Sequence, residues 1–538
     1  MLPIARYRFH AVIVLTILAG IALSLVAQPP PATYAPGWSA PRALATVDLR
    51  DTRGISLSPD QSIHLVWSNT EDDALQVFSA RMSLNGDWLA RPQRISRAGT
   101  RSFSPALALL PDGGDLIAYI EKSPSAALMV SARGEPPRRA VDGAGDMRQL
   151  ALAGNRQDTF AVWSEDRERQ PAIYMARFNT RGDVVSGARR LSAEAALATQ
   201  PALVVAGGAL HVFYFTDDNR YVDLHYARYT LDGEPLDEPL ILSHRAQLGS
   251  TAAYPVVVFT DAAGTIDLLE AIGGSARLSR FDANGSQIGA QPVVLDGIRN
   301  ASALDARTQG DILWVSWSGL ARRNSRPQVL ARPFTLNGKP GGPETRLTFS
   351  TSGAFQPVWL TAGAGLYHLF WVENVSDRDA ALFYASTAQM ADLSIWERLG
   401  FAGSNPPATF VVTVATAFMY VLPLLIVNIW RVVIVSAVLL VAHRLTRANA
   451  IAMTVVLLAA QLPLYWPAQD IIGQSSLALN SASHWAFWVA ATVPILLIAR
   501  QWRRETSESL RWVALAFIWA YLYYWMNAIA LLREAYAP

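Results

Sequence analysis

The 538-residue chain contains no cysteine and only two lysines, Lys122 and Lys339. Without cysteine, neither disulfide bonds nor thiolate metal sites can form. Arginine is therefore the basic residue almost everywhere, which we attribute to coding bias before any arginine-specific chemistry. The formal net charge is +2, with both signs mixed along the chain, so no nucleic-acid-binding surface is expected.

Common catalytic and metal-binding signatures are also missing. The sequence holds no His-Glu-x-x-His motif, phosphate-binding glycine loop or nucleophile elbow. His64, His211 and His368 stand at one repeated position, but equivalent residues of separate repeats cannot converge on one ion. We therefore interpret them as packing residues, and we predict neither a metal nor a cofactor.

Long apolar runs occur only at the two ends of the chain. The overall apolar content of 51% and the mean hydropathy of +0.19 fit a chain that is part soluble domain and part membrane domain. Residues 1–27 end in an apolar run that follows Arg6 and Arg8, which predicts a signal peptide or a membrane anchor. We favour the anchor, because Leu25-Val26-Ala27 is a poor cleavage site. Residues 28–37 form a proline-rich linker.

The stretch Ile55–Ser96 is the unit of an internal repeat that recurs roughly every 50 residues. It reads as four apolar runs separated by turns, one of which is Asn85-Gly86. Alternating apolar runs joined by such turns predict four antiparallel strands. Seven copies are recognised by the residue at the end of the second run: Trp67, Tyr119, Trp163, Tyr214, Leu268, Trp317 and Trp371.

Two further features recur within the copies. The third run of most copies ends in Ala-Arg, as in Ala80-Arg81 and Ala176-Arg177. Turns that accept a positive φ lead into the fourth run at Asn85-Gly86, Arg181-Gly182, Asp232-Gly233, Asn284-Gly285 and Asn337-Gly338.

The seventh copy stops after its third strand, at about Thr387. Residues 37–47, which precede the first copy, resemble a stray fourth strand. This arrangement is typical of a closed ring, in which the N-terminal strand completes the last blade. We therefore predict an all-β, seven-bladed propeller over residues 38–390, with both of its connections on one face.

Residues 391–405 are a predicted juxtamembrane linker, and 406–538 a predicted membrane domain. The runs 408–429, 450–467, 484–500 and 511–531 are apolar enough for four transmembrane helices. Residues 432–443 extend the cytoplasmic side; in the alternative, 430–446 form a separate span. With five crossings in all, the arginine clusters share one side of the membrane. This predicts a multi-pass bacterial membrane protein whose propeller is extracytoplasmic and whose partners include the lipid bilayer.

Glutamates recur two residues after the end of the second strand, in four of the seven copies. They are Glu121, Glu165, Glu270 and Glu373. All should lie on the face that carries the links between strands two and three, here called the top face. One interpretation is a ring of carboxylates that binds a cation or a hydroxyl-rich ligand. The alternative is a set of solvated loop ends that pair with nearby arginines.

A second set of polar residues marks the start of strand one, where a propeller lines the mouth of its central channel. This set consists of Thr52, Ser104, Gln149, Gln200, Tyr254, Ser302 and Gln356. These groups could orient a ligand or hold water. Arg322, Arg323 and Arg326 form the densest basic cluster of the top face. They could bind an anion or a carboxylate, or pair with acidic neighbours.

The copies resemble sialidase-like and TolB-like propellers. The resemblance rests on residues 58–68, 111–121 and 173–192 and extends over about two thirds of the chain. Membership of the sialidase family would imply an arginine trio, a Tyr-Glu nucleophile pair, an Arg-Ile-Pro motif and Ser-x-Asp-x-Gly-x-x-Trp boxes. Arg94-Ile95-Ser96 is a fourth-strand element instead, and Asp60 and Trp67 lack the spacing of such a box. No catalytic residue is therefore transferred.

Three hypotheses for the function follow. The first is a non-catalytic, membrane-anchored propeller that binds or senses a glycan, peptide or protein. The second is a tethered glycoside hydrolase of sialidase-like type that uses Tyr254 or a top-face glutamate. The third is an accessory subunit of a transporter or envelope complex. An enzyme needs an arginine cluster and a nucleophile pair around one point, whereas a binding module can use a broad polar rim.

Overall fold

The structure is a computed structural model in which the chain divides into two compact units. One unit is Tyr34–Ala391, and the other combines Met1–Thr33 with Asp392–Pro538. The structure describes residue 35 and residues 37–388 except 50, 52, 124, 194–196, 218–220, 247–255, 262, 273, 300, 321–325, 349, 351–352, 364 and 375–379. It also describes residues 410–417, 419, 433–434, 436–438, 441, 518, 520–521 and 525.

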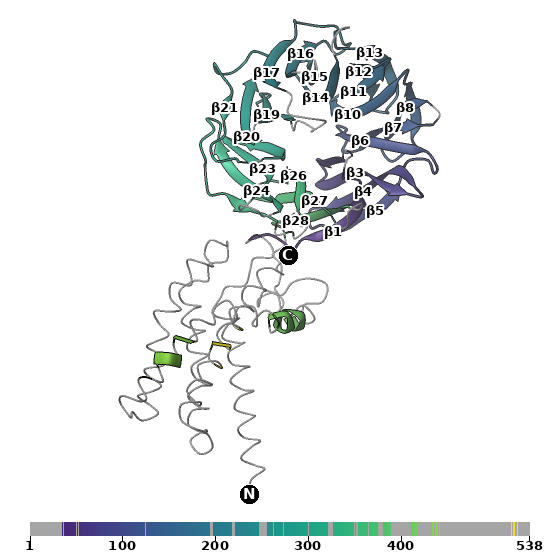
Figure 1. Cartoon of the computed structure of the whole chain (residues 1–538). Helices are drawn as coiled ribbons and strands as arrows, with labels where there is room; N and C mark the ends of the chain where they lie inside the picture. The colour runs from purple at the N-terminus through teal and green to yellow at the C-terminus, as the bar shows by residue number, and fades with distance from the viewer. Residues whose placement is uncertain are drawn as a thin grey trace. The chain divides into compact units, whose positions relative to one another are not determined.

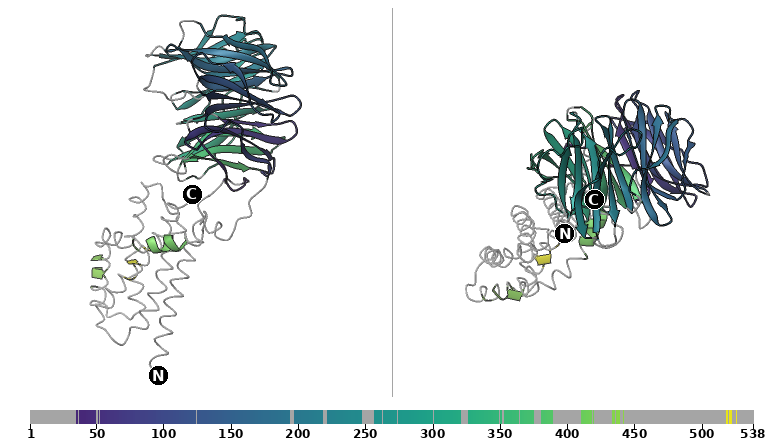
Figure 2. Two further views of the ribbon diagram at one scale, coloured as in Figure 1. Left: turned by 90° about the vertical axis from the view of Figure 1, so that its right-hand side faces the viewer. Right: turned by 90° about the horizontal axis from the view of Figure 1, so that it is seen from above.

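The described residues of the first unit form seven antiparallel sheets of four strands each (Figure 1). The first strands of successive blades contact one another in a closed ring around the central axis. In the two further views the strands run between the two faces of the disc (Figure 2). The predicted seven-bladed propeller is confirmed.

The strands follow the repeats of the sequence. Blades one to three comprise β2 (Arg53–Leu57), β3 (Ser62–Glu71), β4 (Ala74–Ser83) and β5 (Trp88–Arg94); β6 (Arg101–Leu109), β7 (Asp115–Lys122), β8 (Ala126–Ala132) and β9 (Arg138–Asp142); β10 (Asp146–Gly154), β11 (Asp158–Arg167), β12 (Gln170–Asn179) and β13 (Val184–Arg190). Blades four and five comprise β14 (Ala198–Ala206), β15 (Ala209–Asp217), β16 (Tyr221–Tyr229) and β17 (Leu240–Ala246); β18 (Val256–Thr260), β19 (Ile266–Ile272), β20 (Ser275–Phe281) and β21 (Val293–Val294). Blades six and seven comprise β22 (Ala303–Gln309), β23 (Ile312–Leu320), β24 (Pro327–Thr335) and β25 (Thr345–Arg346); β26 (Ala354–Thr361), β27 (Tyr367–Asn374), β28 (Ala380–Ser386) and β1 (Arg42–Val47).

The N-terminal strand closes the ring, as predicted. β1 pairs antiparallel with β28, so it supplies the fourth strand of the last blade (Figure 1). Ser39 N donates to Ser386 O at 2.7 Å, and Ser386 N donates to Ser39 Oγ at 3.0 Å. The two chain connections of the propeller therefore leave it side by side on the face opposite the top face, here called the bottom face.

The core lies between neighbouring blades. Each second strand continues beyond its repeated aromatic, and the aromatics Tyr119, Trp163, Trp317 and Trp371 are fully buried. Trp163 packs with residues of β7 and β8 of the preceding blade in one apolar cluster. The repeated aromatic of blade three therefore belongs to the apolar core that it shares with blade two.

The recurring Ala-Arg pair has two separate roles. The alanine is buried, and in blades one to three the arginine holds the turn between strands one and two at the bottom face. Arg81 pairs with Asp60 at 2.9 Å, Arg133 with Asp112 at 2.8 Å and Arg177 with Asp158 at 2.7 Å.

The glycine turns between strands three and four fill gaps between blades. Gly86, Gly182, Gly233, Gly285 and Gly338 all have φ between +77° and +84°. Each lies against strand three or four of the preceding blade; a Cβ at Gly338, for example, would stand 2.5 Å from Val294 O. Glycine is required here by both the left-handed backbone and the close approach.

No helix within the described residues is long and apolar enough to cross a membrane. The predicted anchor at 11–27 and the predicted spans at 450–467 and 484–500 lie outside the described residues. The predicted spans at 408–429 and 511–531 fall among them only in fragments, of which 410–417 is helical. The membrane domain therefore stays a prediction.

Candidate functional site

The four top-face glutamates are held by the chain that arrives from the preceding blade. Glu121, Glu165 and Glu270 are buried and Glu373 is half-buried. The alternative of solvated loop ends that pair with arginines is therefore wrong about solvation for the three buried residues, although Glu165 and Glu270 do pair with arginines. Their carboxylates lie on separate blades, and each has its own set of donors.

Glu165 has the most complete set of donors. Its Oε1 accepts hydrogen bonds from the backbone N–H groups of Ala144 at 2.7 Å and Gly145 at 2.8 Å, in the link between blades two and three. Its Oε2 accepts from Trp163 Nε1 at 3.1 Å, and Arg167 Nε is 2.9 Å from Oε1. This glutamate joins the core aromatic of its own blade to the incoming link.

The other glutamates repeat this pattern with different donors. Glu373 accepts from Trp371 Nε1 and from Ser350 Oγ, both at 2.6 Å, and its burial raises the pKa of the carboxyl against the effect of these bonds. Glu270 accepts from Ser243 Oγ at 2.7 Å and pairs with Arg245 of β17. Glu121 accepts a longer bond, 3.3 Å, from Thr100. Ligand binding by these residues stays a prediction.

The set at the start of strand one lies around the top end of the channel, and its backbone is unusual. Ser104, Gln149, Gln200 and Gln356 have φ between +51° and +54°. β6, β10, β14 and β26 each carry an irregularity of the strand register at this point. A left-handed conformation is strained for residues other than glycine, and such strain persists only where the surroundings fix it.

Hydrogen bonds between neighbouring blades fix these residues. Asp51 accepts from Ser104 N at 2.9 and 2.8 Å, which joins blade one to blade two. Gln149 Oε1 accepts from Gln200 N at 2.8 Å, which joins blade three to blade four. The polar rim of the channel is therefore held in place before any ligand arrives.

Arg53 and Gln356 form the link between blades seven and one. Arg53 Nη2 donates to Gln356 O at 3.1 Å and also contacts the Gln356 side chain, while Gln356 Nε2 donates to Leu49 O at 3.2 Å. Burial lowers the pKa of Arg53 to about 10, and the negative charge of Asp51 opposes this shift. The rim thus contains a guanidinium, a carboxylate and primary amides, which together can donate and accept hydrogen bonds.

An ion pair lies farther down the first strands. Asp305 Oδ1 accepts from Arg307 Nη1 at 2.9 Å, and its Oδ2 accepts from Trp359 N at 2.6 Å. Burial raises the pKa of Asp305, while Arg307 and the Trp359 amide oppose this shift. The sequence analysis did not single out this pair; a charged Asp-x-Arg within an otherwise apolar first strand was its only signal.

The remaining predicted residues are only partly covered by the structure. Tyr254, Arg322 and Arg323 lie outside the described residues, whereas Arg326 is exposed at the start of β24. Ser302 N donates to Ser318 O at 2.9 Å. Within the described ranges, no group of three or more His, Asp or Glu side chains is arranged to hold a metal ion.

The three repeated histidines do not share one environment. His211 Nδ1 lies 2.7 Å from the Tyr226 hydroxyl, and His368 Nδ1 lies 2.9 Å from the Tyr384 hydroxyl. Both histidines are fully buried, and burial lowers the pKa of each. They are packing residues, as we interpreted them from the sequence.

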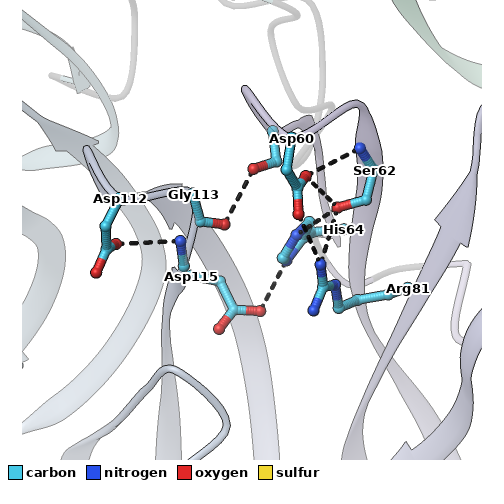
Figure 3. Close-up of polar contacts among 9 residues, drawn as sticks. Asp60, Ser62, His64, Arg81, Asp112, Gly113 and Asp115 are labelled. Carbon is cyan, nitrogen blue, oxygen red and sulfur yellow. Dashed lines mark hydrogen bonds and ion pairs between the residues drawn. The ribbon is translucent and has the colours of Figure 1, made fainter.

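His64 instead joins blade one to blade two (Figure 3). Its Nδ1 lies 2.9 Å from Asp115 Oδ2 of β7, and its Nε2 lies 3.0 Å from Ser62 Oγ. Blade one has Ser79 on β4 where blades four and seven have Tyr226 and Tyr384, so no tyrosine hydroxyl is available to His64.

Ser62, His64 and Asp115 contact one another in the order of a hydrolytic triad, but the serine hydroxyl is not accessible to a substrate. Ser62 is only 2% exposed. Its Oγ donates to Asp60 Oδ1 at 2.6 Å and accepts from Arg81 Nη2 at 3.1 Å (Figure 3). A nucleophile must present a free Oγ to its substrate and pass its proton to the histidine. We therefore interpret this network as a link between two blades.

A cleft of about 610 Å³ opens beside this network at the bottom face. β4 and β5 of blade one form one wall. Blade two forms the other wall with its turn at 112–115 and its link at 133–137. The lining mixes arginine with aspartate and glutamate. Nothing in the sequence analysis assigned a site to this cleft.

The fold defines the class of protein as a seven-bladed β-propeller. No protein-family model matches the chain, and no curated protein matches its sequence. Among solved structures, the chain is similar to the polysaccharide lyase Uly1, with 10% identity over 63% of this chain and 90% of that chain and a TM-score of 0.43.

Two further solved structures are similar to the chain. The alpha-L-arabinanase of Penicillium chrysogenum has 16% identity over 55% of this chain and 99% of its own, with a TM-score of 0.36. The NanB sialidase of Streptococcus pneumoniae has 8% identity over 66% of this chain and 70% of its own, with a TM-score of 0.38. Likeness at this level concerns the fold alone and carries no argument about the ligand.

Proposed function

We propose that the chain is a recognition protein whose propeller binds a hydroxyl-rich ligand, a glycan, at the top mouth of its channel. The observation that supports this most is the rim formed by Asp51, Arg53, Ser104, Gln200 and Gln356. Four of the seven blades contribute to it, and hydrogen bonds between blades hold it in a strained conformation.

Hydroxyl groups both donate and accept hydrogen bonds, and a rim of amide, carboxylate and guanidinium groups matches both functions. A rim fixed in advance also loses little conformational entropy on binding. The top-face glutamates enter this proposal as supports that hold the links above the rim. The hydrolase alternative would instead require one of them to act on the substrate.

The proposal is tested with the purified full chain in detergent against a panel of glycans and envelope peptides. We expect saturable glycan binding without sialoside hydrolysis. We expect Arg53→Met to weaken binding about tenfold or more, since a bond to a charged group contributes about 1.5 to 3 kcal/mol. Arg91→Met is the matched control, because Arg91 is exposed on β5 of the same blade. Turnover that Glu373→Gln abolishes would instead establish the hydrolase, and equal binding by both arginine variants would exclude the rim.

We further propose that the propeller is extracytoplasmic and tethered by the predicted helices. Support comes from the sequence, in which the arginine clusters flanking the apolar runs share one side when the chain crosses the membrane five times. A reporter fused after Pro538 is expected to be active only in its extracytoplasmic form. Activity of a cytoplasmic reporter at the same position would contradict five crossings.

A further inference from the structure

One gap between neighbouring blades holds neither a glycine turn nor the N-terminal segment. Five gaps hold the turns at Gly86, Gly182, Gly233, Gly285 and Gly338. The gap between blades six and seven is filled by the N-terminal segment, where Trp38 packs on Trp359 with ring centroids 5.5 Å apart. The remaining gap lies between blades one and two and coincides with the 610 Å³ cleft.

The gap is open because the hairpin of blade two is cut short. In blade three, Met175 of β12 pairs with Arg189 of β13, fourteen residues later in the chain. At the equivalent place in blade two, Val130 of β8 pairs with Arg138 of β9, only eight residues later. The short link contains Gly134, and a Cβ added there would meet nothing within 4 Å. Blade two therefore has no hairpin tip to insert against blade one.

The occupied gaps show how a tip is held. Arg138 of blade two donates to Arg181 O at 3.0 Å and pairs with Asp183 at 2.7 Å, on either side of Gly182. Arg189 of blade three donates to Asp232 O at 3.0 Å and pairs with Glu234 at 2.6 Å, on either side of Gly233. In both gaps an arginine of the preceding blade thus holds the tip through the carbonyl oxygen before the glycine and the acidic side chain after it.

Blade one carries a polar side chain at the same receiving position. Gln93 pairs with Ser79 as Arg138 pairs with Val130 and as Arg189 pairs with Met175, and Arg94 is the next residue of β5. Both Gln93 and Arg94 line the cleft. Arg94 also pairs with Glu71 at 2.8 Å, so only part of its guanidinium is engaged.

Arg81 of blade one lines the same cleft. Its equivalents in blades two and three each hold their own blade and a neighbouring tip at once. Arg133 pairs with Asp112 and donates to Thr180 O of the blade-three tip, and Arg177 pairs with Asp158 and with Asp232 of the blade-four tip. Arg81 pairs with Asp60 in the same way, but its side chain, 42% exposed, faces the open cleft.

From this vacancy we propose that the cleft between blades one and two is a docking site for a partner protein. The occupant is a tight β-hairpin turn that carries a left-handed glycine and an adjacent aspartate or glutamate. Its carbonyl oxygens and carboxylate accept hydrogen bonds from Arg81, Gln93 and Arg94. The partner protein thus supplies the hairpin turn that, in the filled gaps, comes from the next blade of the same chain.

The first test uses a backbone-cyclised peptide of residues 229–236, which form the blade-four tip, as the probe for the full chain in detergent. We expect measurable binding that Arg81→Ala and, separately, Gln93→Ala each weaken about tenfold. The control variant is Arg91→Ala on β5, and the control peptide carries valine in place of glycine, which cannot adopt the positive φ readily. Absence of binding, equal binding of both peptides, or a cleft occupied by a glycan of the panel would overturn the proposal.

A second test fills the cleft with a longer hairpin of the chain's own blade two. In this variant residues 132–137 are replaced by the sequence of residues 177–188, which restores the missing length of the hairpin. We expect the melting temperature to rise and binding of the cyclic peptide to be lost. Continued peptide binding by the folded variant would contradict the proposal. Glycan binding at the channel mouth should stay the same in this variant, so the two proposals fail or succeed separately.

Discussion

Glu165→Ala is expected to lower the free energy of unfolding of the propeller by about 3 to 5 kcal/mol. The substitution removes the acceptor of two backbone N–H groups, Ala144 and Gly145, and of Trp163 Nε1. It also leaves Arg167 without the carboxylate that it contacts at 2.9 Å. Donors buried without an acceptor lose their full hydration, which is why the expected loss exceeds that of one hydrogen bond.

The loss is measured by urea denaturation of the full chain in detergent, followed by tryptophan fluorescence. Glu168→Ala is the matched control, since Glu168 is exposed on the turn that follows Glu165 in the same hairpin. This control should change stability by about 0.5 kcal/mol or less. A loss below about 1 kcal/mol in Glu165→Ala would show that the buried hydrogen bonds do not hold the link.

Trp38→Ala is expected to destabilise the propeller by about 3 to 5 kcal/mol, because it empties a filled gap between blades. Trp38 is 9% exposed and contacts the edge of Trp359 in the cluster that joins blades six and seven. It also precedes Ser39, whose bonds to Ser386 align the closing strand. Loss of this packing should loosen the closure of the ring as well as the core.

Limited proteolysis and urea denaturation together measure this effect. We expect cleavage near residues 37–47 to accelerate in Trp38→Ala, with the rest of the propeller cut later. Trp88→Ala serves as the control, because Trp88 is a half-buried tryptophan on the fourth strand of blade one. Equal losses in the two variants would mean that Trp38 has no special part in closing the ring.

The architecture could be predicted from the sequence because its signals repeat. The seven second-strand landmarks, the missing fourth strand after Thr387 and the spare strand before Ile55 required no knowledge of tertiary contacts. A ring whose N-terminal strand completes the last blade leaves only short, protected sheet edges. The structure confirms each of these features.

The environment of the candidate residues could not be predicted in the same way. The position of Glu165 was visible as a repeat feature, but its donors come from a link whose path depends on packing between blades. The sequence therefore suggested a solvated side chain where the structure has a buried one. The left-handed backbone at Gln200 and Gln356 was hidden for a similar reason, since a residue before proline ordinarily adopts an extended conformation.

One feature of the sequence indicates the cleft, but it can be interpreted only with the structure. The link Arg133-Gly134-Glu135-Pro136-Pro137 replaces the longer glycine hairpin found in the other copies that have one. A shortened hairpin ordinarily indicates a shorter loop and nothing more. Only the packing of Gly182 and Gly338 against preceding blades shows that a missing tip leaves a vacant gap.

Hydrogen exchange of the full chain, with and without its best-binding glycan, tests the central claim most directly. The amides of Ser104 and Gln200 donate to side chains of neighbouring blades, so they report on the rim itself. Recognition at the channel mouth predicts added protection in the segments 53–57, 101–105, 197–201 and 353–357. Protection confined to other parts of the propeller, with these segments unchanged, would contradict it.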